Sequence, residues 1–70
     1  MKDVKNYRVS RDWSINCITT KSITGQITYG LEVVMECVDW KEITYSISGI
    51  ADKDVANKKF QELVKKYKNL

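Results

Sequence analysis

The sequence predicts a two-layer α+β domain, in which a three-stranded antiparallel meander sheet is covered on one face by a C-terminal helix. Two observations lead to this prediction. Up to residue 48, apolar and polar residues alternate, which is typical of strands with one buried face. From residue 53, apolar residues instead recur three or four positions apart, which is typical of an amphipathic helix. A chain of 70 residues has room for one domain, predicted over residues 1–70.

The first strand is predicted over residues 6–20. Its apolar residues share one parity, and therefore one face: Tyr7, Val9, Trp13, Ile15 and Cys17. Arg11 places a charge on that same face, where it marks a bulge or an inward charge that guards a sheet edge. The sequence leaves two alternatives open, a continuous strand or a strand broken into two at Arg11–Asp12.

The second and third strands are predicted over residues 26–38 and 42–48, with turns around Gly25 and at residues 39–41. The second has the longest alternation and is therefore placed in the centre of the sheet. Its inward residues are Ile27, Tyr29, Leu31, Val33, Met35 and Cys37. The third strand presents three alternating apolar residues: Ile43, Tyr45 and Ile47.

The helix is predicted over residues 53–68. Its apolar stripe consists of Ala56, Phe60, Leu63, Val64 and Tyr67. Asp52 is the expected N-cap, because a carboxylate at that position accepts a hydrogen bond from the first turn. Lys65, Lys66 and Lys68 lie in the last turn, where positive charge suits the helix dipole.

The residue types argue against an enzyme or a metalloprotein. The chain has no histidine, and its two cysteines, Cys17 and Cys37, lack the paired spacing of a zinc site. We therefore expect no catalytic residues, no metal and no cofactor. The cysteines are expected in the core, too far apart for a disulfide, which indicates a cytoplasmic protein with reduced thiols. No apolar run approaches the ~20 residues that span a bilayer, so no membrane association is expected.

Glu32 and Glu36 share the polar face of the second predicted strand, with Asp12 near them, and are interpreted as surface charge. Gly30, in mid-strand, indicates a bulge or strong twist, or a close approach by a ligand or partner backbone. Trp40 lies in a predicted turn, apart from the other aromatic residues. The roles of Gly30 and Trp40 remain open at this stage.

The third strand contains no charge between residues 43 and 48 and lies at the sheet edge if the strands follow chain order. Such an edge tends to pair with another chain. Ile43, Tyr45 and Ile47 are therefore the candidate self-association edge, and a homo-oligomer or an unidentified protein partner is expected. The alternative is an edge protected by a loop, by the N-terminal arm or by a bulge.

The helix offers a second candidate surface. Its outer face carries two pairs of lysines, each pair seven residues apart: Lys58 with Lys65, and Lys59 with Lys66. A basic stripe of this kind contacts phosphates in nucleic-acid-binding proteins. Glu62 lies in the middle of the stripe, which is equally typical of a solvated helix face.

The stretch Thr28-Tyr29-Gly30-Leu31-Glu32-Val33, with Ile47-Ser48 and Asp52 leading into the helix, resembles a family of short uncharacterised proteins from Clostridium-like bacteria. The resemblance covers roughly residues 24–66. It implies a cytoplasmic bacterial protein without an assigned activity, and it supplies no catalytic residues. The sequence as a whole favours a small non-enzymatic interaction or regulatory module, with weak nucleic-acid binding as the alternative.

Overall fold

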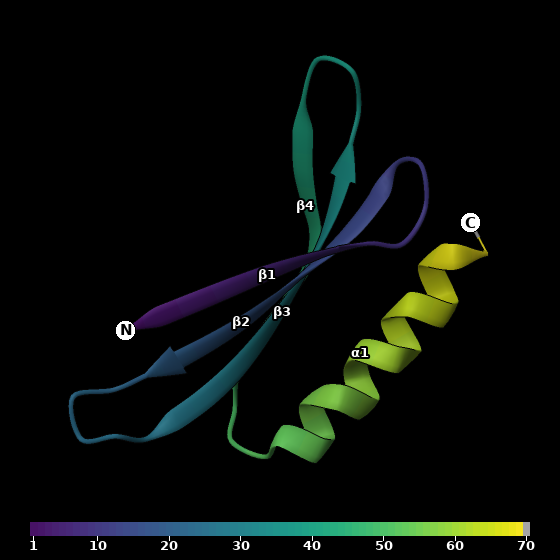
Figure 1. Cartoon of the computed structure of the whole chain (residues 1–70). Coiled ribbons are helices and arrows are strands. Elements are labelled where there is room, and N and C mark those ends of the chain that lie inside the picture. Colours follow the sequence, from purple (N-terminus) through teal and green to yellow (C-terminus); the bar gives the residue numbers. More distant parts are fainter. Residues whose placement is uncertain (70) are drawn as a thin grey trace.

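The computed structural model describes residues 1–69 as a four-stranded antiparallel sheet with one helix packed against it (Figure 1). The sheet order is the chain order, β1-β2-β3-β4. The elements are β1 (Lys2–Arg8), β2 (Trp13–Lys21), β3 (Ile27–Glu36), β4 (Lys41–Ile50) and α1 (Lys53–Lys68). The α+β class, the antiparallel meander and the covering C-terminal helix are confirmed. Leu70, the last residue of the predicted domain, lies outside the described residues.

The count of three strands is wrong. Of the two alternatives left open for the first strand, the break around Arg11–Asp12 is the one found, and it gives β1 and β2. The amides of Val9 and Ser10 donate to the Trp13 carbonyl over 3.0 and 3.1 Å and close a tight hairpin. The Arg8 guanidinium donates to the Arg11 carbonyl over 2.7 Å and braces the same loop. Arg11 lies in this loop with a side chain that is 95% exposed, so its charge never faces the core.

The core lies between α1 and the face of β2, β3 and β4 that α1 covers. Its buried members are Ile15, Leu31, Val33, Leu63 and Tyr67. The Tyr7 and Phe60 ring centroids lie 5.3 Å apart, which extends the core to β1. The Trp13 and Tyr67 ring centroids lie 4.7 Å apart and join the start of β2 to the end of α1. The Asp52 carboxylate accepts a hydrogen bond from the Asp54 amide over 2.8 Å, which is the expected N-cap.

The two cysteines lie in different environments. Cys17 pairs with Leu31 across β2 and β3 and packs against the core. Cys37 lies beyond the last residue of β3 and is exposed, so the expectation of a core position is wrong for this residue. Within residues 1–69 both are free thiols.

A bulge in β4 separates the three apolar residues of the predicted third strand. Val33 pairs with Tyr45 and Val34 pairs with Ile43, so Thr44 is an extra residue in β4. Because neighbouring residues of a strand face opposite sides, Ile43 lies with Val34 on the face that α1 leaves uncovered. The expectation that Ile43 shares the inward face of Tyr45 is therefore wrong. A second irregularity lies where Leu31 pairs with Ile47 and Tyr29 with Ile50.

Candidate interaction surface

β4 is the outermost strand on one side of the sheet, and no strand within residues 1–69 pairs with its outer edge. Its outward backbone groups follow from the register. The Glu36 amide donates to the Asp12 carbonyl over 2.8 Å, so Glu36 and the alternate residue Glu32 direct their backbone groups toward β2. Glu32 is opposite Ser46 in β4. Because the Glu32 backbone bonds to β2, this pair makes no hydrogen bonds between β3 and β4, and the Ser46 N–H and C=O therefore point away from β3. These groups are available to another strand.

Residues 43–50 of β4 carry no charged side chain. Ile43 is 55% exposed on the uncovered face, whereas Tyr45 and Ile47 are half-buried against the core on the helix side. The structure therefore places all three predicted edge residues on one edge strand, but on different faces of it. Whether this edge binds another chain stays a prediction.

A groove runs between β4 and α1 on the helix side. It has a volume of about 340 Å³ and is lined by Ile47, Ile50, Val55, Lys58, Lys59 and Glu62. Val55 is 54% exposed at its rim. The Lys59 ammonium lies 3.9 Å from a Glu62 carboxylate oxygen and 5.8 Å from the centroid of the Tyr45 ring. The groove therefore has apolar residues on its β4 side, whereas its helix side carries one exposed apolar residue, Val55, beside three charged ones.

The four lysines predicted to contact phosphate do not form one free basic surface. Lys59 is engaged with Glu62 and Tyr45, and Lys58 lines the groove beside β4. Lys66 lies 5.5 Å from the centroid of the Tyr67 ring, and Lys65 is exposed in the last turn. Nucleic-acid binding by this face stays a prediction.

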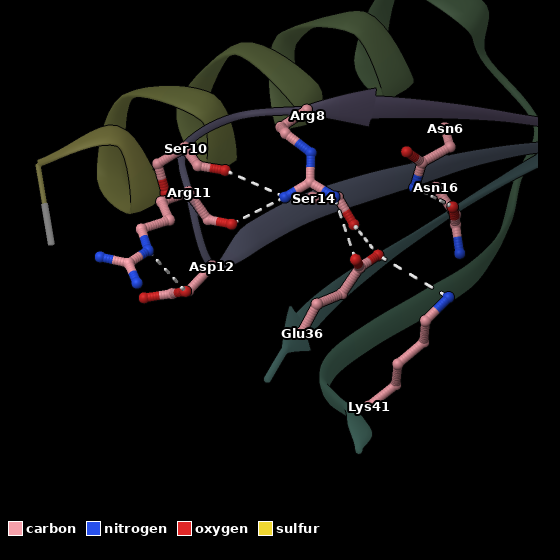
Figure 2. A network of polar contacts seen from close by, with 9 residues as sticks. All are labelled: Asn6, Arg8, Ser10, Arg11, Asp12, Ser14, Asn16, Glu36 and Lys41. Atoms are coloured by element: carbon pink, nitrogen blue, oxygen red, sulfur yellow. Dashed lines mark hydrogen bonds and ion pairs between the residues drawn. The ribbon is translucent and has the colours of Figure 1, made fainter. Parts of the chain in front are cut away.

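The uncovered face carries a network of polar side chains at the end where β3 leads into β4 (Figure 2). Glu36 lies at its centre, 3.0 Å from the Arg8 guanidinium and 4.0 Å from the Lys41 ammonium. The Ser14 hydroxyl donates to Glu36 over 3.4 Å and is fully buried beneath these side chains. Glu36 of β3 is thus paired with two cations and linked by its side chain to each of the other three strands, β1, β2 and β4.

Next to this network lies a hollow of about 560 Å³, which sequence reasoning missed. It is lined by Asn6, Asn16, Val34, Glu36, Lys41, Glu42 and Ile43. The Asn6 amide donates to the Asn16 side-chain oxygen over 2.8 Å at its rim. The hollow depends on β1 being a separate strand and on the bulge that turns Ile43 over, so no local pattern in the sequence could reveal it.

Gly30 and Trp40, whose roles the sequence left open, have different structural settings. A Cβ at Gly30 would lie 3.1 Å from the Ile47 carbonyl oxygen, so the close approach at Gly30 is made by β4 of the same chain. Trp40 is 49% exposed in the turn between β3 and β4, a turn that also contains the fully exposed Val38. Trp40 therefore lies outside the core.

Chemical groups of the kind that enzymes use are sparse on this surface. Burial raises the pKa of the Cys17 thiol, which keeps it protonated and poorly nucleophilic. Within residues 1–69 no three Asp, Glu or Cys residues gather closely enough to hold a metal ion. Nor does any helix of these residues have the length and apolar character needed to cross a membrane.

Comparison with known proteins gives no family. No family model, curated protein or solved structure matches the chain significantly. The resemblance to short clostridial proteins therefore stays a prediction, and the case for a function rests on the β4 edge.

Proposed function

We propose that this chain is a small non-enzymatic interaction module that binds another protein strand along the outer edge of β4. The observation that carries the proposal is the combination of outward Ser46 backbone groups with a segment, residues 43–50, that lacks charge. Backbone hydrogen bonds to an added strand supply affinity in this mode of binding. Charges on an edge strand normally oppose it.

The groove beside β4 supports the same proposal. An added strand that follows β4 would extend the apolar surface formed by Ile47, Ile50 and Val55. Half-exposed Val55 would lose contact with water on binding, which favours association. A cytoplasmic location is part of the proposal, in keeping with two free thiols.

The proposal is tested by blocking the edge with proline. Ser46→Pro removes an outward N–H without removing a hydrogen bond to β3, because edge strands tolerate proline where the N–H faces solvent. Val4→Pro is the matched control, since Val4 is half-exposed on the other edge strand, β1. Tagged wild-type, Ser46→Pro and Val4→Pro proteins are each used for affinity purification at moderate salt.

We expect the wild type and Val4→Pro to retain a stoichiometric protein, which includes additional copies of the chain, and Ser46→Pro to lose it. Equal recovery by all three proteins would contradict the proposal, as would recovery of monomer alone by the wild type. Circular dichroism spectra that match the wild type establish that each variant is folded.

A further inference from the structure

We propose that the strand that pairs with β4 is β4 of a second copy of this chain, and that the two copies are related by a two-fold axis through Ser46. This inference rests on the proposed function and names its partner. The two β4 strands run antiparallel, so the sheets of the two copies join into one continuous sheet with four strands from each copy. Both α1 helices then lie on the same side of that sheet.

The position of the axis follows from the shape of β4. The regular part of the strand is short, because one irregularity lies at Thr44 and another at Ser48–Gly49. Ser46 is midway between Thr44 and Ser48. A two-fold axis at Ser46 therefore sets the irregular residues of the two copies opposite each other and leaves the regular segments paired.

Backbone chemistry selects the same residue. The Ser46 N–H and C=O both point outward, so each Ser46 donates to and accepts from its counterpart across the axis. Their Cα atoms then lie about 5.5 Å apart, as in any hydrogen-bonded antiparallel pair. The adjacent residues, Tyr45 and Ile47, direct their backbone groups inward, as the alternation requires.

Side-chain complementarity favours a second copy over an unrelated strand. The axis places Tyr45 of each copy directly opposite Ile47 of the other, which is an aromatic and β-branched pair of the kind that stabilises sheets. Residues 43–50 bring no like charges together because they have none. Lys41 and Glu42, the two charged residues of β4, fall opposite Ala51 and Ile50, so no like charges meet at the ends of the strand either. The edge is thus complementary to itself.

Cysteine trapping tests both the partner and the register. In a background with Cys17→Ala and Cys37→Ser, Ser46→Cys places two thiols across the axis, within the 4.4–6.8 Å Cα separation that disulfides require. Ser48→Cys is the matched control, because Ser48 is also exposed on β4. The two Ser48 residues would be offset by four positions, or about 13 Å.

We expect light scattering to give twice the 8.1 kDa mass of one chain for the wild type, and the one-chain mass for Ser46→Pro. Under oxidation by diamide, Ser46→Cys should link into covalent dimers at least ten times faster than Ser48→Cys. Faster linking of Ser48→Cys, or equal rates, would overturn the register and with it the inference.

The proposed function and this inference fail in different ways. A wild type that is monomeric at high concentration, but loses a different captured protein on Ser46→Pro substitution, overturns the second copy as partner and leaves edge binding standing. If Ser46→Pro changes neither the recovery of a bound protein nor the dimer mass, both the proposed function and this inference are overturned.

Discussion

The two edge strands of the sheet differ in how they face solvent. In β1, four of seven residues are charged: Lys2, Asp3, Lys5 and Arg8. In β4, charge is confined to Lys41 and Glu42 at the start of the strand, and the remaining eight residues are neutral. Both strands present outward backbone groups, so their difference lies in the side chains that flank those groups.

This comparison shows how a small sheet can direct association to one edge. An added strand on β1 would remove water from several charges, whereas an added strand on β4 would cover serine, threonine and apolar side chains. The bulge at Thr44 shortens the regular part of β4, which limits the register in which a strand can pair. A single usable edge gives a closed dimer, but two would give open-ended assembly.

The largest expected effect comes from removing the charges of β1. The triple substitution Lys2→Thr, Asp3→Thr and Lys5→Thr should convert a finite species into large assemblies, because β1 then keeps a single charge, Arg8, which is paired with Glu36. The net charge falls only from +3 to +2, since two lysines and one aspartate are removed, so lost repulsion does not explain the change. Sedimentation velocity measures the size distribution.

A triple variant that keeps the wild-type sedimentation coefficient at all concentrations would show that charge does not protect β1. Val4→Pro introduced into the triple variant should restore the finite species, because it blocks the same edge by another route.

A smaller effect is expected from placing charge on β4. Thr44 and Ser48 lie opposite each other across the proposed axis, so Thr44→Lys with Ser48→Lys sets like charges together twice. The dimer dissociation constant should rise at least tenfold, or about 1.4 kcal/mol. Thr44→Lys with Ser48→Glu sets opposite charges together and should bind more tightly than the double lysine variant. Dilution calorimetry compares the two, and equal constants would refute the pairing of Thr44 with Ser48.

The helix was predictable because its signals are local. The apolar stripe, the Asp52 cap and the lysines of the last turn all lie within or next to residues 53–68, and α1 spans Lys53–Lys68. The sequence raised the strand break at Arg11–Asp12 as an alternative but did not decide it, for a geometric reason. Four residues, 9–12, separate β1 from β2. Because this number is even, odd-numbered residues such as Tyr7 and Trp13 face the helix in both strands. The alternation of apolar and polar residues therefore appears continuous across the break.

The edge was predictable only in part. Its lack of charge is visible in the sequence, but the bulge at Thr44 depends on pairing with β3, so the face of Ile43 could not be predicted. The outward direction of the Ser46 backbone depends on a register that runs through β2 as well. Non-local pairing of this kind has no signature in the spacing of residues along one strand.

A more modest effect is expected from removing the helix N-cap, a change that should lower stability without changing association. Asp52→Ala removes the N-cap hydrogen bond to the Asp54 amide and should lower the free energy of unfolding by about 1 kcal/mol. Asp52 is not part of the β4 strand, so the mass in light scattering should stay that of the wild type at temperatures where the variant is folded. If the folded variant instead has the mass of one chain, the dimer depends on the stability of the whole fold rather than on the β4 edge.

The smallest effect is expected from the two ion pairs by which Glu36 of β3 is linked to the edge strands β1 and β4. Glu36 lies 3.0 Å from Arg8 of β1 but 4.0 Å from Lys41 of β4. Both cations are more than half exposed, so each pair contributes less than about 1 kcal/mol. Arg8→Ala should nevertheless lower stability more than Lys41→Ala, since Arg8 also donates to the Arg11 carbonyl and holds the hairpin loop closed. Urea unfolding of the two variants, each with and without Glu36→Gln, measures both coupling energies. A larger coupling energy with Glu36 for Lys41 than for Arg8 would show that the ion pair to β4, not the one to β1, contributes more to stability.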